Sequence, residues 1–494
     1  MRFIRLVFTF LFVLMVFFSF GQQDQCYIRL DGCFDDWYSH EQVVREEQDN
    51  NTPFCAISIS NDTKRLYLLV EFKEEQLLNE LNNYYLEIDA DNNPLTGYRL
   101  GPVGAELGWS FGGRMGYYNI NSEAAVIGYN NINYFALPNY QSKTFELSID
   151  LDCKPDGNRR LFESDTIRVL LYNGQKESPQ FFPSGQMPLK YRISQRQNVF
   201  KNQTIDKSNG SDFRLLSWNT YHSAIMDPRR SQNAFNLLLT LNPDVITFNE
   251  CWNTDPLAVQ DSLNRIWKRA GQEVSWTCVK KDMGTLTASK FRILYSFSLI
   301  AGHQVTVSVL EFQKQCKPER FTVINSHFTC CANNIQRTLE VDAVRDFVNY
   351  PQKYLPDTLL SAIRKIVMAG DLNLVGSSSH YSTLTKGLYL YAKSSGLCDL
   401  RPSHLDAPLC YTWTDKLKPF SPSRLDYILY TAETIGSLKS FVYNIPGFFI
   451  DDFNSVSFTA NRDRSVSDHF PVVSDFIIYS SSKQIKLPCN TCNQ

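Results

Sequence analysis

The stretch Ser-Asp-His-Phe-Pro-Val at residues 467–472 decides how we interpret this chain. It places an Asp beside a His, directly before an apolar run from Phe470 to Ile478 that has the texture of a strand. A His at the rim of a sheet can act as a proton acceptor, and a neighbouring carboxylate fixes its tautomer and stabilises its charged form. We therefore predict that His469 is a catalytic base oriented by Asp468.

Five upstream segments share this design, in which a buried-strand pattern has a polar residue at one end. The polar residues are Asn219 after 213–218, Glu250 after 244–249, His327 after 321–326, Asp371 and Asn373 after 366–370, and Asp426 before 427–430. Strand ends of one sheet converge at its rim. Carboxylates, carboxamides and imidazoles are what phosphate ester cleavage requires: oxygen ligands for Mg²⁺, donors for the phosphate and a base for water.

Each segment alone has an ordinary structural explanation. Glu250 fits a surface carboxylate at a strand end, and His327 fits a core histidine with its hydrogen bonds satisfied. The Gly-Asp-Leu-Asn stretch at 370–373 fits a simple turn. Six such segments in one order across residues 213–478 are harder to explain as unrelated turns, so we favour a single site.

In this order the segments resemble the endonuclease/exonuclease/phosphatase superfamily, whose members include deoxyribonuclease I. The resemblance is carried by Trp218-Asn219, Asn249-Glu250, Ser326-His327, Gly370–Asn373, Leu425–Tyr427 and Ser467–His469. It covers about residues 213–478 and implies an α/β fold, the two-sheet α/β sandwich of the deoxyribonuclease I-like type.

Within the superfamily the chain is most similar to neutral sphingomyelinases. The similarity rests on Asp244–Trp252, where Asn-Glu and an aromatic residue follow a strand, on a helical pattern over 337–348, and on Asp468–Val472. Two segments depart from that branch: Cys330-Cys331 stands where a more polar loop is usual, and Gly284–Lys290 only partly follows a glycine-rich strand.

The resemblance implies a role for each motif residue. Mg²⁺ would be held by Glu250, supported by Asn219, and the phosphate would be contacted by His327 and Asn373. The attacking water or a ligand group would be oriented by Asp371, and the proton would be accepted by His469 with Asp468 and Asp426 in support. Which histidine protonates the leaving alkoxide is left open.

The length and texture of the chain indicate two domains. The 494 residues exceed what one core usually serves. We predict a signal peptide at 1–21, an all-β sandwich at 22–200, a linker at 201–212, the catalytic domain at 213–480 and a tail at 481–494. Short aromatic and aliphatic runs punctuated by Asn, Gly and Pro support the first domain, whose start at 30–37 loosely resembles sugar-binding sandwich modules.

The turn Asp89–Gly97 places two carboxylates and two amides together, which is compatible with Ca²⁺. It is not an EF-hand, because Pro94 stands where that loop needs Gly and Leu100 where it needs Glu. An Asp/Asn-rich turn that hydrogen-bonds its own backbone is the commoner case, and we prefer it here.

Several features predict a secreted, disulfide-bonded glycoprotein. Residues 1–21 combine Arg2 and Arg5 with an apolar run too short for a membrane span. Thirteen Cys favour disulfides, with one thiol left over. We expect Cys398 to pair with Cys410, Cys489 with Cys492, and one of Cys330 and Cys331 to reach Cys316 or Cys278. Sequons begin at Asn50, Asn61, Asn202 and Asn209.

Sphingomyelin is the expected substrate, cleaved to ceramide and phosphocholine at a membrane surface. Residues 444–450 are apolar, and Phe448 and Phe449 form either an aromatic foot that dips into the lipid or a buried strand. A secreted nuclease is the alternative, although residues 213–480 hold 27 Lys and Arg against 24 Asp and Glu, a weak excess for a phosphate groove. An inert binding protein is the third possibility, and the intact set of polar residues argues against it.

Overall fold

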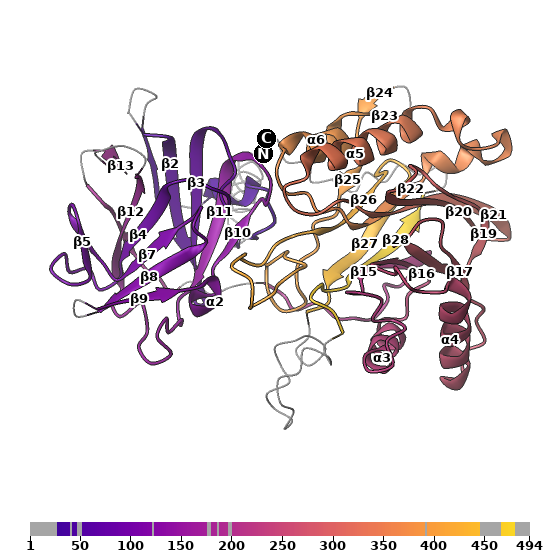
Figure 1. Ribbon diagram of the computed structural model, residues 1–494, viewed down its shortest axis with the longest axis horizontal. Helices are drawn as coiled ribbons and strands as arrows, with labels where there is room; N and C mark the ends of the chain where they lie inside the picture. The colour runs from indigo at the N-terminus through magenta and orange to yellow at the C-terminus, as the bar shows by residue number, and fades with distance from the viewer. Residues whose placement is uncertain are drawn as a thin grey trace, which may run out of the picture.

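A computed structural model describes residues 27–39, 42–46, 52–120, 123–174, 179–184, 187–195, 200–390, 393–444 and 466–479. The fold is sheet-rich, as predicted, and the strands of the first and second halves form two bodies that lie side by side (Figure 1). No helix in these ranges is long and apolar enough to cross a membrane. The predicted signal peptide, the segment with Phe448 and Phe449, the Cys489-Cys492 pair and the tail lie outside the described residues.

The first half contains two antiparallel sheets. One has the strand order β1-β2-β3-β11-β10, and the other has the order β13-β12-β4-β7-β8-β9 with β14 also paired to β12. Their bounds are β1 Gln42–Arg45, β2 Phe54–Asn61, β3 Arg65–Gln76, β4 Tyr84–Asp89, β7 Leu107–Ser110, β8 Met115–Ile120, β9 Glu123–Ile127, β10 Phe135–Leu137, β11 Ser142–Asp150, β12 Thr166–Asn173, β13 Gln180–Phe182 and β14 Leu189–Arg192. A small pair, β5 (Tyr98–Leu100) with β6 (Val103–Ala105), follows the turn after β4.

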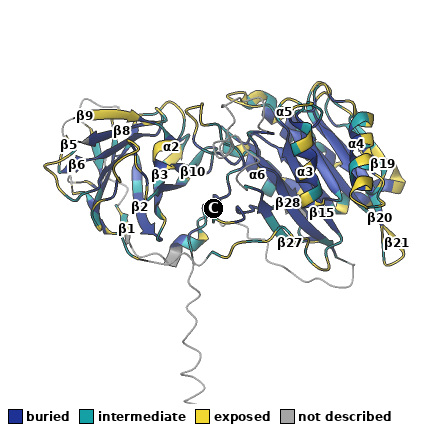
Figure 2. Cartoon of the chain, turned by 90° about the horizontal axis from the view of Figure 1, so that it is seen from below, coloured by how far each residue is buried: buried dark blue, intermediate teal, exposed yellow. Residues whose placement is uncertain are grey.

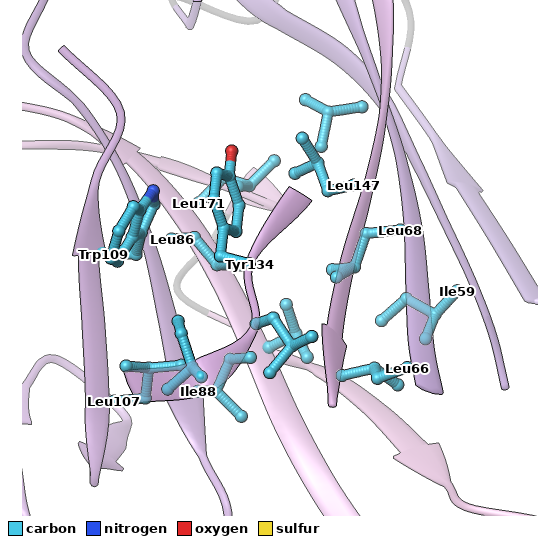
Figure 3. Packing of buried hydrophobic residues seen from close by; sticks show 14 of the residues in the cluster. Ile59, Leu66, Leu68, Leu86, Ile88, Leu107, Trp109, Tyr134, Leu147 and Leu171 are labelled. Atoms are coloured by element: carbon cyan, nitrogen blue, oxygen red, sulfur yellow. The ribbon is translucent and has the colours of Figure 1, made fainter. Parts of the chain in front are cut away.

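Both sheets contribute side chains to one apolar core (Figure 3). Leu68 and Leu147 enter it from the first sheet, and Leu86, Trp109 and Leu171 enter it from the second. Alternate residues of each strand point inward, which is the pattern of sheets packed face to face.

The second half contains two six-stranded sheets. One has the order β17-β18-β16-β15-β28-β27, and the other has the order β19-β20-β21-β22-β26-β25. Their bounds are β15 Phe213–Asn219, β16 Val245–Asn249, β17 Thr277–Val279, β18 Leu286–Ser289, β19 Arg292–Ser298, β20 Gln304–Lys314, β21 Lys317–His327, β22 Ile366–Asp371, β25 Cys398–Asp399, β26 Asp426–Tyr430, β27 Ile435–Val442 and β28 Val472–Ile478.

Alternation along the strands explains how these two sheets pack. Leu215 of β15 meets Val323 of β21 and Val367 of β22 in one buried cluster between the sheets. Their chain neighbours Leu216 and Ile324 lie in separate clusters on the outer faces. Because successive side chains point to opposite faces, strands buried on both sides read as the continuous apolar runs seen in the sequence.

Helices cover the outer faces. The helices α3 (Ser231–Leu241) and α4 (Pro256–Arg269) pack on the sheet that contains β15. On the other sheet lie α5 (Asn334–Asn349) and α6 (Ser378–Lys386). Figure 2 shows mostly buried strands, with exposed residues on these helices.

The helical pattern of the sequence predicts helices over 231–241, 336–350 and 381–396, and the first two agree with α3 and α5. The expected helix at 381–396 is wrong beyond Lys386, because the chain turns at Gly387 into a hairpin of β23 (Leu388–Leu390) and β24 (Lys393–Ser395). We did not predict α4, although Asp255 caps it by accepting the Leu257 N–H and Pro256 occupies its first turn.

Residues of the first half contact residues of the second half. Asn139 accepts the Arg424 N–H through Oδ1 at 2.7 Å, and the ring of Tyr140 stacks on Tyr381 with centroids 4.9 Å apart. Leu30 lies in one buried cluster with Leu409. The segment containing Arg424 leads directly into β26, so the first half contacts a loop that positions part of the candidate site.

Cysteine pairing differs from expectation. Cys398 is disulfide-bonded whereas Cys410 is free and buried, so these two do not pair. Cys278 and Cys316 are also free. Cys316 stands before β21 and Cys330 after it, so the length of that strand separates them. Cys330 and Cys331 are free as well, with their Sγ atoms 2.6 Å apart.

One predicted glycosylation site is wrong. Asn61 is buried, its Nδ2 donates to the carbonyls of Asp62 and Ser194, and its Oδ1 accepts from Tyr191. A glycan on this buried Nδ2, which donates two hydrogen bonds, would not fit the folded chain. Asn202 and Asn209 are exposed, which keeps their sequons available.

Candidate active site

Strand register brings the predicted site residues together. β15 and β16 are parallel with Asn219 opposite Asn249, so Glu250 emerges beside Asn219. β22 and β26 are antiparallel with Asp371 opposite Asp426. β28 runs antiparallel to β15, so the residues just before it, including His469, lie at the end of β15.

Asn219 joins the two sheets at this end. Its Nδ2 donates to Glu250 Oε1 at 3.2 Å and to Asp371 Oδ2 at 3.1 Å. Its Oδ1 accepts the Tyr221 N–H at 3.1 Å, which fixes the orientation of the amide. Asn219 therefore holds two carboxylates in place through its nitrogen.

Glu250 occupies a strained turn beside the site. Its φ is 57°, in the left-handed region, and its Oε2 accepts the His222 N–H at 2.9 Å. Burial opposes ionisation of this carboxyl, but the charge of His327, the His222 N–H, the charge of His469 and the Asn219 amide together lower its pKa. Glu250 is thus held as a carboxylate.

Two imidazoles flank Asp371. The Nε2 atoms of His327 and His469 lie 3.6 Å and 3.8 Å from Asp371 Oδ2. Their Nδ1 atoms face away, to Gln304 Oε1 at 3.1 Å for His327 and to Asp426 Oδ2 at 2.7 Å for His469. Both rings therefore present Nε2 toward the same carboxylate.

The partner of His469 differs from the prediction. Asp426 binds its Nδ1, whereas Asp468 Oδ2 accepts from Trp413 Nε1 at 2.9 Å. The prediction that Asp468 orients His469 is wrong, because the Asp468 carboxylate is directed to the indole N–H of Trp413. Asp426, which we had placed in support, provides the orienting bond.

Burial and charge shift the pKa values in opposite directions. Burial raises the pKa of Asp371 to about 7, and the charge of His469 only partly offsets this. Burial disfavours the charged form of His469, but the carboxylates of Asp426 and Asp371 outweigh it and raise the pKa to about 10. Burial lowers the pKa of His327.

Two hydrogen-bonded carboxamides, Asn249 and Asn325, support the backbone of the site, and we did not predict this support. Asn249 Nδ2 donates to Asn325 Oδ1 at 2.9 Å, while Asn249 Oδ1 accepts the Asp371 N–H at 2.8 Å. Asn325 Nδ2 in turn donates to the Leu286 carbonyl at 3.0 Å. Both amides are fully buried. Asn249 belongs to the Asn-Glu motif that carries the resemblance, but we assigned it no role, and we interpreted Asn325 only as part of a strand.

Asn373 lies at the same rim with φ 43°. Its N–H donates to Asp371 Oδ1 at 3.1 Å and its Nδ2 donates to the Phe328 carbonyl at 3.1 Å. These bonds leave Oδ1 and one amide hydrogen for another partner.

The donor set fits a divalent cation. Glu250 and Asp371 offer carboxylate oxygens that share one amide donor, and Mg²⁺ in proteins is commonly held by one or two carboxylates plus waters. Asp426 Oδ1 is also buried without a hydrogen-bond partner. Glu250 and Asp371 would hold such an ion, with Asn219 fixing their positions.

Aromatic side chains line the rim next to Glu250. The rings of His222 and Trp252 lie 4.9 Å apart and those of Tyr221 and His222 lie 4.6 Å apart. Lys280, a neighbouring cation, is occupied by the backbone carbonyls of Cys251 and Trp252. Arg230 lies 5.8 Å from the centre of the Tyr221 ring and donates to the carbonyls of Tyr221 and His222. Both cations beside these rings are therefore bonded to backbone carbonyls.

The sequence profile of the Endonuclease/Exonuclease/phosphatase family matches residues 216–469, which is more than half of the chain and spans the whole cluster. The chain belongs to this family. Its members are phosphoesterase hydrolases that use divalent metals. No curated protein sequence matches the chain.

Several solved structures are similar to this chain over somewhat more than half of its length. The endonuclease/exonuclease/phosphatase from Bacteroides vulgatus is 15% identical, covers 54% of this chain over 99% of its own length, and has a TM-score of 0.37. The human nocturnin catalytic domain is 14% identical, with 54% and 94% covered and a TM-score of 0.37. ANGEL2, a 2′,3′-cyclic phosphatase, is 14% identical, with 57% and 99% covered and a TM-score of 0.38.

Proposed function

We propose that this protein is a secreted, Mg²⁺-dependent phosphodiesterase that hydrolyses sphingomyelin to ceramide and phosphocholine. The observation that carries the hydrolytic part is the convergence of Glu250, Asn219 and Asp371 with the imidazoles of His327 and His469 at one sheet end. The catalytic fold would be the two-sheet α/β sandwich of the deoxyribonuclease I-like type.

The residues divide the chemistry among them. A bound Mg²⁺ would supply Lewis-acid stabilisation of the charge that builds on the phosphoryl oxygens. His327 and Asn373 contact the phosphate, to which Asn373 donates its remaining amide hydrogen, while Asp371 orients the attacking water. Asp426 occupies Nδ1 of His469 and stabilises the imidazolium form. Nε2 is therefore the His469 atom that accepts and releases a proton during the reaction.

The rim supports a choline-bearing substrate. The rings of Tyr221, His222 and Trp252 stand beside Glu250, and aromatic faces attract quaternary ammonium groups. Of the cations beside these rings, Lys280 is held by carbonyls, and Arg230 donates to the carbonyls of Tyr221 and His222 and to Asp227. A nucleic-acid groove needs cations free to neutralise phosphates, so this arrangement favours lipid over nucleic acid.

One assay panel tests the substrate. The purified protein is incubated with sphingomyelin vesicles, plasmid DNA or a soluble phosphoinositide, in Mg²⁺ or in EDTA. We expect phosphocholine release in Mg²⁺ alone, lost in His469→Ala and in Glu250→Ala but kept in Glu273→Ala, which removes an exposed carboxylate outside the cluster.

Three results would contradict the proposal. DNA nicking without lipid turnover would identify the secreted nuclease. Turnover that survives both EDTA and Glu250→Ala would remove the metal from the chemistry. No turnover of any substrate would indicate an inert binding protein.

Membrane contact is proposed through Phe448 and Phe449. Replacing both with Ser should weaken binding to sphingomyelin vesicles with little change on a soluble diester. Equal loss on both substrates would instead indicate a core position.

A further inference from the structure

A second cluster of carboxylates lies in the first half, away from the candidate active site. Asp89 ends β4, Asp91 stands in the following turn, and Glu106 stands between β6 and β7. One oxygen of each lies within 4.8 Å of the others. Oxygens that share a Ca²⁺ at 2.3–2.6 Å are at most about 5 Å apart, so the spacing suits one ion.

The backbone holds each carboxylate by one oxygen. The Asn93 N–H donates to Asp89 Oδ1 at 2.9 Å and to Asp91 Oδ1 at 2.8 Å, while the Ala90 N–H donates to Glu106 Oε2 at 2.8 Å. The two bonds from the Asn93 N–H are turn bonds of the kind that the sequence predicted for Asp89–Gly97. Glu106 joins from outside that turn, and we did not predict its part in the cluster.

The remaining oxygens of the two buried members have no hydrogen-bond partner. Glu106 is 9% exposed, and its Oε1 is buried without a hydrogen-bond partner. Asp89 is fully buried, and its Oδ2 likewise has no hydrogen-bond partner. The nearest cation to Asp89 is Arg168, whose Nη1 is 3.7 Å from Oδ2 and whose Nε donates to Asn92. Buried unpaired carboxylate oxygens cost free energy unless a charge or a donor faces them.

The local charge is unbalanced. Three carboxylates face one guanidinium that is shared with Asn92. Burial raises the pKa of Glu106 to about 7 and raises that of Asp89, and the mutual repulsion of the carboxylates adds to both shifts. A divalent cation would relieve this repulsion and occupy the unpaired oxygens.

Gly97 shows that the loop is built closely around Glu106. Its φ is +62°, and a Cβ there would lie 2.8 Å from Glu106 Oε1 and 2.5 Å from the Ala105 carbonyl carbon. The loop thus closes on the carboxylate with no room for a side chain, which keeps the oxygen beside the two Asp residues.

We propose that Asp89, Asp91 and Glu106 form a Ca²⁺ site that ties the turn after β4 to the strand β7. Three carboxylates, each anchored by a backbone N–H, suit the flexible oxygen coordination of Ca²⁺ better than the strict octahedron of Mg²⁺. The site is separate from the candidate active site and stands whether or not the chain cleaves phosphodiesters.

Calorimetric titration with Ca²⁺ tests the site in full-length, chelator-stripped protein. The Glu250→Gln background removes the main carboxylate of the candidate active site. We expect one Ca²⁺ per chain and a melting temperature that rises with Ca²⁺. Glu106→Gln should weaken binding at least tenfold and abolish the rise, and Mg²⁺ should bind more weakly than Ca²⁺.

Glu87→Gln is the matched control. Glu87 is also a buried carboxylate on β4, two residues before Asp89, but it is not part of the cluster, so its replacement should leave Ca²⁺ binding unchanged. If Glu106→Gln does not fold, Asp91→Asn at the half-buried turn position replaces it, with the melting temperature in chelator as the folding check. Equal Ca²⁺ affinity in wild type and variant overturns the proposal, as does no binding up to about 10 mM, above the weakest common extracellular sites.

Discussion

The imidazole of His469 is bonded through Nδ1 to Asp426 Oδ2 at 2.7 Å, and both residues are buried. A short bond between a carboxylate and an imidazole is charge-assisted and strong in such a setting. The bond directs Nε2 toward Asp371, 3.8 Å away. Asp426 thereby sets both the tautomer and the direction of the ring.

Asp426→Asn should therefore damage catalysis more than Asp468→Asn. We expect kcat on a soluble diester such as bis(p-nitrophenyl) phosphate to fall by roughly 10²–10⁴ in Asp426→Asn. Asp468→Asn keeps the bond to Asp426 and should lose much less. Since the Asp426 charge raises the pKa of His469, the pH–rate profile of Asp426→Asn should also move to lower pH. A larger loss in Asp468→Asn than in Asp426→Asn would refute this assignment.

The sequence located the strand ends but not the pairings among the side chains. Asn219, Glu250 and Asp371 were found because each follows the pattern of a buried strand, and register then brings these strands to one rim. Adjacency misled us for Asp468, because its carboxylate accepts from Trp413 Nε1, whereas the His469 ring is bonded to Asp426. The correct partner, Asp426, is 43 residues away in the chain and meets His469 only through folding.

The buried amides Asn249 and Asn325 show a second limit. Each ends or interrupts an apolar run just as a strand-end surface residue would, and only the packing of two sheets reveals their mutual bond at 2.9 Å. Glu106 was missed for the same reason, since nothing local marks a carboxylate that reaches back to a turn 15 residues earlier in the chain. Long-range pairing is the information that periodicity does not carry.

Gly370 should tolerate no side chain. Its φ is +147° and a Cβ would lie 1.8 Å from the Ser326 carbonyl oxygen on the neighbouring strand. We expect Gly370→Ala to cost roughly 3 kcal/mol or more in the free energy of unfolding, and to lower kcat because Asp371 follows directly.

Gly302→Ala is the matched control for this prediction. Gly302 also has a positive φ, +80°, but nothing lies within 4 Å of the position that a Cβ would take. Gly302→Ala should therefore cost only the strain of a left-handed backbone, about 1–2 kcal/mol in the free energy of unfolding. Equal losses in urea unfolding for the two variants would show that the close approach to Ser326 does not matter.

The buried pair of Arg214 and Asp475 should matter for stability alone. Arg214 Nε and Nη2 donate to the two carboxylate oxygens of Asp475 at 2.6 Å and 2.9 Å, and both residues are 1% exposed. Asp475→Ala leaves a buried guanidinium unpaired and should cost about 3–5 kcal/mol in the free energy of unfolding. Since Arg214 lies five residues before Asn219 on β15, roughly 16 Å along the strand, kcat of the folded protein should stay unchanged.

An exposed ion pair provides the comparison. Asp165 and Arg192 are paired at 3.1 Å on the surface, so Asp165→Asn should cost less than about 1 kcal/mol. If Asp475→Ala lowered kcat as strongly as it lowered stability, the two ends of β15 would be coupled in a way that we do not expect.

His404 should make the protein sensitive to mild acid. Its ring is buried against Tyr411 and Phe470, and its Nε2 donates to the Tyr411 carbonyl at 2.8 Å. Burial lowers the pKa of His404 from 6.5 to about 4. Above pH 6.5 the ring is neutral in both the folded and unfolded states, so it has no effect on the pH dependence. Between pH 6.5 and 4 the unfolded state binds a proton that the folded state does not bind. As the pH is lowered through this range, the free energy of unfolding therefore falls by about 1.4 kcal/mol per pH unit, or about 3 kcal/mol in all.

His404→Gln isolates this contribution. A Gln amide can donate to the Tyr411 carbonyl but does not titrate, so urea unfolding of the variant should show a shallower loss of stability from pH 6.5 to 4. Because the other histidines titrate in both proteins, the difference between the two curves reports His404 alone. Parallel curves over that range would mean that the ring is protonated in the folded state, and that its burial beside Phe470, the residue after His469, does not exclude the charge.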